Sequence, residues 1–332
     1  MLISTILNYW PLAILLAVAV HLVGNRFSRG LNKYPGPFLA SLTGWWRFFD
    51  VLGRRPDITH IKLHKELGDI VRLGPNCLSF ANPKALKSIY GLNQGYVKSG
   101  FYPVQQGVSR GKILPSLFST TDESYHAQFR RSVNGAFSMS QVVQYEPLVD
   151  STIEVFLNRT DELFAKTGAT CDFMRWLQYF AADVVGELTY SKRVGYLENN
   201  EDVGGLMKAL NSLFNYAAPV GQMPFLDRLL AKNPLMLLLD KYGLLSITPL
   251  QPIAKFARAR MAERTTPSEK QNGSLTSTRH KDLLSKFYQA KADRPEFMND
   301  DRVLTMALSM TFAGSDTTYA TRYLPAATSA NL

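Results

Sequence analysis

The first 25 residues of the chain carry no charged side chain, and most of them are apolar. Leu2 to Gly24 form a run of 23 residues, which is about the length that a helix needs to cross a hydrocarbon core of roughly 30 Å. Because lipid offers the backbone no hydrogen-bond partner, a single spanning segment has to be helical. The run therefore predicts a transmembrane anchor over residues 1–24.

Six basic residues and one acidic residue lie between residues 26 and 55. Since Lys and Arg gather on the cytoplasmic side of a span, we expect one pass, with the body of the protein facing the cytosol. A cleaved signal peptide is the alternative, but such peptides begin with positive charge, which this chain lacks. The net charge of +10 would also be compatible with nucleic acid as a partner. No zinc-finger spacing, basic heptad region or RNP-like strand supports it, so the expected partner is a lipid bilayer.

Composition places the chain among globular or membrane-anchored proteins, because 46% of its residues are hydrophobic and 19% are charged. The two cysteines, Cys77 and Cys171, are too few for a disulfide-rich scaffold and form no C-x-x-C pair. This cysteine usage is typical of an intracellular body.

Local signals indicate a mainly α chain with a small β portion. Residues 34–37 read Tyr-Pro-Gly-Pro, which stops any helix or strand and predicts a basic, proline-containing hinge over 25–40. Residues 70–73 and 77–80 are short apolar runs around Gly-Pro-Asn and predict a β-hairpin. Helical spacing of apolar residues dominates from Tyr125 onward.

A final helix is expected to begin near Asn299, where the acidic residues Asp300 and Asp301 suit a helix N-terminus. Its apolar residues face nearly every side, which is typical of a helix in the middle of a large domain. We expect this domain to cover 41–318. Residues 319–332 are rich in Ala, Thr and Ser, and predict an aberrant tail at which the helix stops.

Residues 313–318 of that helix read Ala-Gly-Ser-Asp-Thr-Thr, a pattern that local rules disfavour in a buried helix. Glycine costs about 1 kcal/mol relative to alanine in a helix interior, and a buried carboxylate such as Asp316 needs partners. The absent Cβ of Gly314 would let a flat or small group approach the backbone, and Asp316 with Thr317 could relay protons to it. The segment is therefore a candidate functional site.

Other motifs in the chain are weaker. Residues 107–111 match G-x-S-x-G, but Pro115 opposes the helix that a serine nucleophile needs after it. His60 and His64 have zinc-ligand spacing without the glutamate of H-E-x-x-H. His126 and Arg130 would share one helix face and could grip an anionic group, although an ordinary basic surface explains the same spacing. The sequence predicts no metal ligand.

The 313–318 segment resembles the oxygen-binding groove in the central helix of the cytochrome P-450 haem-thiolate monooxygenases. The amino-terminal anchor, the basic cluster and the Pro-Gly-Pro hinge resemble the microsomal form of this family. Residues 183–190 and 195–197 resemble its fungal members, particularly the pisatin demethylase-like group. His126 and Arg130 fall where the C helix of the family meets the haem propionates, although Trp is commoner than His at the first position.

The resemblance implies an endoplasmic reticulum protein that binds haem b and uses an NADPH-dependent flavoprotein reductase. It implies oxidation of an apolar organic substrate with dioxygen, in secondary metabolism or detoxification. Asp316 and Thr317 would deliver protons, and Ala313 and Gly314 would leave room for dioxygen. His126 and Arg130 would hold the haem propionates.

The resemblance covers about residues 1–318, the amino-terminal two thirds of the family fold behind a single transmembrane helix. The E-x-x-R pair and the F-x-x-G-x-R-x-C-x-G loop that supplies the thiolate are missing, and neither Cys77 nor Cys171 has that context. We therefore expect either a truncated gene product or a truncated gene model, inactive as it stands and without an axial cysteine. The alternative is a non-catalytic, membrane-anchored helical binding protein, which needs no such ligand.

Overall fold

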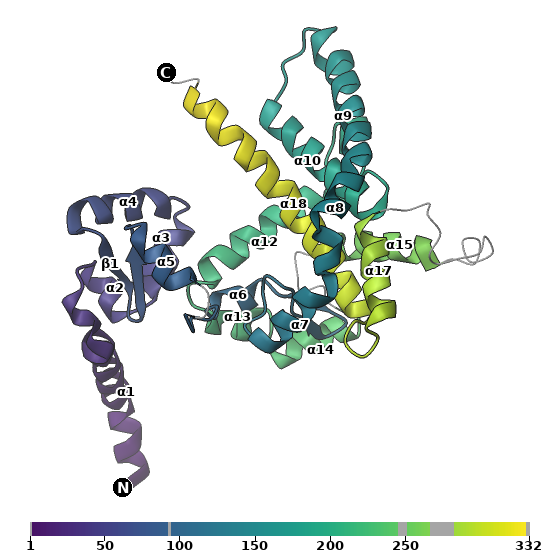
Figure 1. Cartoon of the computed structure of the whole chain (residues 1–332). Coiled ribbons are helices and arrows are strands. Elements are labelled where there is room, and N and C mark those ends of the chain that lie inside the picture. The colour runs from purple at the N-terminus through teal and green to yellow at the C-terminus, as the bar shows by residue number, and fades with distance from the viewer. Residues whose placement is uncertain (1, 92–93, 245–250, 266–281, 330–332) are drawn as a thin grey trace. The chain divides into compact units, whose positions relative to one another are not determined.

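The computed structural model describes residues 2–91, 94–244, 251–265 and 282–329, and most of them are helical (Figure 1). The chain divides into two compact units. Unit 1 comprises Met1–Val104 and Asn215–Leu230, and unit 2 comprises Gln105–Phe214 and Ala231–Leu332. The expectation of a mainly α protein with a small β portion is confirmed.

Unit 1 contains short helices around a two-stranded sheet. Its elements are α1 (Leu2–Phe27), η1 (Ser28–Lys33), α2 (Phe38–Leu42), α3 (Trp45–Leu52), α4 (Pro56–Leu67), β1 (Ile70–Gly74), β2 (Cys77–Phe80), α5 (Lys84–Tyr90), α6 (Phe101–Val104) and α13 (Phe225–Leu230). The second half of α12 (Leu206–Val220) also belongs to this unit.

Helix α1 contains the predicted span and ends three residues after Gly24. Within the described residues, its segment Tyr9–Phe27 is the one helical stretch that is long and apolar enough to cross a membrane. No residue of this segment is buried against the protein. Composition and exposure therefore agree that α1 is a candidate membrane span.

The predicted β-hairpin is confirmed. Strands β1 and β2 pair antiparallel, with Val71 opposite Ser79 and Arg72 opposite Leu78. The segment before α2 is fixed to this hairpin, because the Arg72 N–H donates to the Pro35 carbonyl at 2.7 Å. A Cβ at Gly36 would lie 2.1 Å from the Arg72 carbonyl oxygen, so only glycine fits there.

Unit 2 is built around the long helix α18 (Asp300–Ser329). Its other elements are β3 (Gly107–Ser109), β4 (Lys112–Leu114), α7 (Glu123–Val133), η2 (Asn134–Phe137), α8 (Met139–Val142), η3 (Val143–Tyr145), α9 (Glu146–Thr160), η4 (Asp161–Ala165), α10 (Phe173–Tyr190), α11 (Tyr196–Asn199), η5 (Val203–Gly205), the first half of α12, α14 (Pro234–Lys241), α15 (Gln251–Thr265) and α17 (Leu283–Asp293).

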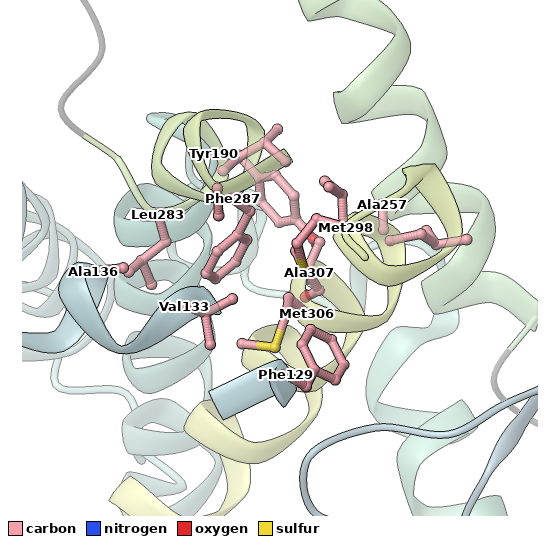
Figure 2. Close-up of a cluster of buried hydrophobic side chains, with 14 of the residues drawn as sticks. Phe129, Val133, Ala136, Tyr190, Ala257, Leu283, Phe287, Met298, Met306 and Ala307 are labelled. Atoms are coloured by element: carbon pink, nitrogen blue, oxygen red, sulfur yellow. Dashed lines mark hydrogen bonds between the residues drawn. The ribbon is translucent and has the colours of Figure 1, made fainter. Parts of the chain in front are cut away.

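Helix α18 begins where the sequence predicts, with the side chain of Asn299 accepting a hydrogen bond from the Arg302 N–H at 3.0 Å. Its residues Val303 and Ala307 are completely buried. Figure 2 shows Phe129 of α7 and Phe287 of α17 with Ala307 in one apolar cluster, to which Val303 also belongs. The expected burial of this helix is therefore found for its amino-terminal part, residues 303–307, in unit 2.

The end of α18 differs from the expectation. The helix does not stop at Thr318 but continues through Pro325 to Ser329. Alanine favours helix, and the polar residues of 319–329 do not prevent one. The composition shift after Thr318 was therefore a poor signal for a helix end.

Residues 107–111, which match G-x-S-x-G, form a second β-hairpin. Gly107 pairs with Leu114 and Ser109 with Lys112, and the turn residues Arg110 and Gly111 both have positive φ. Such a turn suits the twist of two paired strands. Ser109 therefore sits in a hairpin and not on a strand-to-helix elbow, as the sequence argument against a hydrolase expected.

Candidate functional site

One face of α18 lines an apolar cavity of about 280 Å³ in unit 2. The lining residues of α18 are Thr305, Leu308, Ser309, Phe312, Ala313 and Thr317. Their spacing of three or four residues puts them on the same side of a helix. The face therefore runs along three turns and reaches into the 313–318 segment.

The opposite walls come from parts of the chain far away in sequence. They are Gln105, Gly107, Leu114, Ser116, Phe118 and Ser119 near the second hairpin, Leu213 and Phe214 of α12, and Ile253 of α15. None of the lining residues carries a charge. The rings of Phe214 and Phe312 lie 5.3 Å apart. An uncharged, ring-lined cavity favours an apolar organic ligand.

Three hydroxyl groups interrupt the apolar face of α18, and each donates its proton to the preceding turn. Thr305 Oγ1 donates to the Asp301 carbonyl at 2.7 Å, and Ser309 Oγ to the Thr305 carbonyl at 2.8 Å. Thr317 Oγ1 donates to the Ala313 carbonyl at 2.7 Å. Because these protons are used within the helix, the hydroxyl oxygens keep lone pairs that can accept a hydrogen bond from a ligand.

The structure brings Ala313 and Thr317 together at the cavity, as two of the predicted site residues. Asp316 belongs to the helical backbone of α18, but its side chain lies outside the described residues. The predicted role of Asp316 therefore stays a prediction.

Gly314 meets a neighbouring helix and is not among the residues that line the cavity. A Cβ at this position would lie 2.5 Å from Cγ2 of Val185, on α10. Helix α10 packs along α18, so the missing side chain of Gly314 allows these two helices to approach closely. Sequence reasoning attributed this glycine to ligand space and did not foresee the helix contact.

The contact predicts that Gly314→Ala lowers the unfolding free energy when residue 185 is valine and raises it when residue 185 is alanine. In the natural chain, we expect a net loss of about 1 kcal/mol of unfolding free energy, because overpacking of 1–3 kcal/mol exceeds the helix gain of about 1 kcal/mol. In a Val185→Ala background, the same substitution should stabilise by up to about 1 kcal/mol. Urea unfolding of the four chains measures this, and an equal effect in both backgrounds would contradict the packing argument.

His126 and Arg130 lie one turn apart on α7. The side chain of Asp122 caps the start of this helix by accepting from the Tyr125 N–H at 2.9 Å. His126 is half-buried and Arg130 is exposed, whereas Phe129 is completely buried. The two basic residues share unit 2 with the cavity but do not line it. Their predicted contact with haem propionates stays a prediction.

The described residues offer no thiolate for a haem iron at this cavity. Neither Cys77 nor Cys171 is among the residues that line it, and burial, followed by the charge of Asp172, raises the pKa of the Cys171 thiol. A raised pKa opposes the thiolate form that binds iron. No group of His, Cys, Asp or Glu side chains within the described ranges is arranged to hold a metal ion. The described residues thus supply the walls of an apolar cavity and no thiolate ligand beside it.

A family model described as "Cytochrome P450" matches residues 36–323. The chain is 41% identical over 288 residues to the cytochrome P450 monooxygenase cicH of Emericella nidulans, covering 87% of this chain and 56% of that protein. A cytochrome P450 monooxygenase of Aspergillus terreus is 37% identical, with 87% of this chain and 57% of that protein covered.

The cytochrome P450 monooxygenase mpaDE' of Penicillium brevicompactum is 34% identical over 317 residues, which covers 93% of this chain and 35% of that protein. The chain thus spans about half the length of the first two relatives, and less of the third. None of these names specifies the pisatin demethylase-like group, so that finer assignment stays a prediction. The broader resemblance is confirmed by the family model and these relatives, and the chain belongs to the cytochrome P450 family.

Proposed function

We propose that this chain carries the oxygen-side and substrate-side walls of a haem monooxygenase that inserts one oxygen atom into an apolar organic substrate. The observation that carries this proposal is the uncharged cavity along α18, which includes Ala313 and Thr317 of the Ala-Gly-Ser-Asp-Thr-Thr segment. In a family member, haem b supplies the dioxygen chemistry when it is bound. The residues of this chain shape the space beside it.

Each site residue has a distinct role in the proposal. Thr317 holds a hydroxyl proton at the cavity, where it donates to the Ala313 carbonyl, and Asp316 replaces that proton from solvent. Ala313 keeps its part of the cavity wall free of a larger side chain, and Gly314 lets α18 lie close to α10. His126 and Arg130 bind the haem propionates with charge-assisted hydrogen bonds.

We further propose that α1 anchors the protein in the endoplasmic reticulum membrane, with the body in the cytosol. The apolar segment Tyr9–Phe27 and the basic residues after it support this topology. An NADPH-dependent flavoprotein reductase in the same membrane would supply electrons to the complete protein, and the excess of basic residues favours docking of an acidic partner.

The orientation has a direct test, because residues 158–160 read Asn-Arg-Thr, a glycosylation acceptor that is modified only in the lumen. Asn158 is exposed. Expression in a eukaryotic cell followed by glycosidase treatment should leave the mobility of the chain unchanged. A second acceptor, Asn-Gly-Ser at residues 272–274, lies outside the described residues. A shift that is abolished by Asn158→Gln, by Asn272→Gln or by the two together would overturn the cytosolic orientation.

The monooxygenase proposal is tested by a fusion of residues 1–323 with the part of the Emericella nidulans relative that follows its matched region. With a reductase and NADPH, the fusion should bind haem and oxidise apolar compounds. A fusion that retains haem with its thiolate ligand but oxidises no apolar compound would contradict the proposal.

Sequencing the transcript beyond the codon for Thr318 shows whether the natural product encodes the E-x-x-R and cysteine-loop motifs.

The 332-residue chain expressed alone provides the matched control. Since Cys77 and Cys171 both lie outside the cysteine-loop motif, we expect its reduced carbon monoxide difference spectrum to lack the band of a thiolate-ligated haem, and its monooxygenase activity to be undetectable. Such a band from this chain would show that one of the two cysteines ligates iron. Cys77→Ser and Cys171→Ser variants would identify which one.

A further inference from the structure

A buried arginine closes the carboxyl end of α1 in unit 1. Arg72 of β1 is 2% exposed, and its guanidinium donates to four carbonyl oxygens. Two belong to the end of α1, Asn25 at 2.7 Å and Arg26 at 2.8 Å. The other two are Gly74 at 3.2 Å and Pro75 at 2.8 Å, in the turn of the hairpin. The candidate membrane helix is therefore tied to the body.

These four carbonyl groups stabilise the Arg72 guanidinium through their dipoles, but none of them carries a negative charge that would neutralise it. No carboxylate is among its described partners, and burial, followed by the charge of Arg26, lowers the pKa of Arg72 from its ordinary value. An arginine remains protonated in proteins, and a buried charge is normally paired. The four bonds also leave one of its five N–H groups, on Nη1, for another acceptor.

A polar cavity of about 240 Å³ adjoins this guanidinium. Arg26, Lys33, Tyr34, Ser41 and Arg72 line it, with residues 35–37 and Asn32. None of these residues is acidic, so three cations face one cavity without an anion in its wall. Arg26 donates to Ser41 Oγ at 2.8 Å and lies 4.9 Å from the centre of the Phe38 ring. Within the described part of the chain, neither Arg26 nor Lys33 forms an ion pair.

The cavity lies where the candidate membrane span ends. The span reaches Phe27, Arg26 is in the last turn of α1, and Lys33 ends the following turn η1. The phosphates of a bilayer lie just beyond its hydrocarbon core, so a membrane-inserted α1 would bring the cavity to their depth. Basic residues at this depth attract anionic lipids.

We propose that the cavity between Arg26, Lys33 and Arg72 binds the phosphate of an anionic glycerophospholipid in the leaflet on the body's side of the membrane. Phosphate oxygens would accept from these cations and from the Tyr34 hydroxyl, in the charge-assisted geometry that favours phosphate, whereas the Ser41 hydroxyl already donates to the Phe38 carbonyl at 2.6 Å. The bound lipid would compensate the buried charge of Arg72 and hold α1 at a fixed angle to the hairpin of unit 1. This inference rests on the membrane anchoring proposed above.

The competing explanation is that lipid binds to a diffuse, generally basic surface and not to a defined cavity. A substitution of Arg29 distinguishes the two explanations. Arg29 is exposed, belongs to the same turn as Lys33 and carries the same charge, but it does not line this cavity. A diffuse surface loses equal affinity when either charge is removed. Of these two substitutions, a defined cavity site loses affinity with the replacement of Lys33 and keeps its affinity with the replacement of Arg29.

The test uses the full chain in non-ionic detergent micelles at about 0.15 M salt, where long-range attraction is screened. Dioctanoyl phosphatidate, dioctanoyl phosphatidylcholine and inorganic phosphate are titrated separately by calorimetry. We expect saturable binding of one phosphatidate per chain, weakened about tenfold by Lys33→Gln and less than twofold by Arg29→Gln. Phosphatidylcholine and inorganic phosphate should each bind at least tenfold more weakly than phosphatidate. Circular dichroism confirms that both variants remain folded.

Equal weakening by the two variants would overturn the proposal in favour of a diffuse surface. Inorganic phosphate that binds as tightly as phosphatidate would show a free-anion site and not a lipid site. Flotation with phosphatidylcholine vesicles tests anchoring separately. A chain that floats but shows no saturable phosphatidate binding overturns the headgroup site alone, whereas a chain that does not float overturns the anchor and this inference together.

Discussion

Replacing Asp282 with alanine is expected to lower the unfolding free energy of the chain by about 3–5 kcal/mol, the usual cost of breaking a buried ion pair. Asp282 is completely buried. Its Oδ2 atom pairs with Arg264 of α15 and accepts from Ser191 Oγ at 2.8 Å. Its Oδ1 atom caps α17 by accepting from the Ser285 N–H at 2.9 Å.

The size of the effect follows from what the substitution leaves behind. The Arg264 side chain is 14% exposed and would keep its charge without a carboxylate partner. Its remaining acceptors in the network are both neutral, the Tyr190 carbonyl and Ser285 Oγ, each at 3.0 Å. The amino-terminal N–H groups of α17 would also lose their cap, which typically costs about 1 kcal/mol. One carboxylate thus holds the ends of α10, α15 and α17.

Urea unfolding, followed by circular dichroism, measures this loss. Glu162→Ala is the matched control, because Glu162 pairs with Arg159 at 2.6 Å while its side chain is 53% exposed. An exposed pair contributes about 1 kcal/mol or less. If Asp282→Ala and Glu162→Ala lowered the unfolding free energy equally, the buried network would contribute no more to stability than an exposed ion pair, and the prediction would be wrong.

The helices and the first hairpin could be predicted because their signals are local. Asn299 caps α18 from a neighbouring position, and the Gly-Pro-Asn turn joins two short apolar runs. The second hairpin was missed because its strands have three residues each and its turn reads Arg-Gly. The boundary between the two units was also out of reach, because unit 1 takes in residues 215–230 from the middle of the chain.

The 183–190 segment shows what a resemblance leaves unexplained. The resemblance to fungal members of the family includes Asp183 in its motif but gives this residue no role. In the structure its carboxylate is completely buried and accepts from the Gly195 and Leu197 N–H groups, both at 2.8 Å. Gly186 lies against the same loop, since a Cβ there would be 3.1 Å from the Lys192 carbonyl oxygen. The motif therefore holds the loop after α10 in place.

Of the residues that line the cavity, only residues on α18 were predicted. The 313–318 segment pointed to Ala313 and Thr317, and helical spacing on the same face could have added Thr305 and Ser309. The facing residues Phe118, Leu213 and Ile253 come from separate parts of the chain, and no local pattern connects them. Their position depends on the packing of α12 and α15 in unit 2, which a single sequence does not specify.

Thr317→Val is expected to reduce product formation per NADPH oxidised by about 100-fold in the fusion of residues 1–323 with the carboxyl-terminal part of the relative. Positioned proton transfer typically contributes 10²–10⁴-fold, and valine keeps the shape of threonine without its hydroxyl. The Thr317 hydroxyl is at the cavity and donates to the Ala313 carbonyl at 2.7 Å, so the transfer requires this hydroxyl to turn from the carbonyl toward the group in the cavity.

Thr317→Ser is the decisive companion, because it restores the hydroxyl and removes only a methyl group. We expect the serine variant to stay within tenfold of the natural chain, and both variants to bind haem and consume NADPH. Product and NADPH are measured together at equal haem content. If valine and serine reduced the yield equally, the role of Thr317 would be to shape the cavity. If valine alone reduced it, the hydroxyl on this face of α18 would be the group that moves the proton.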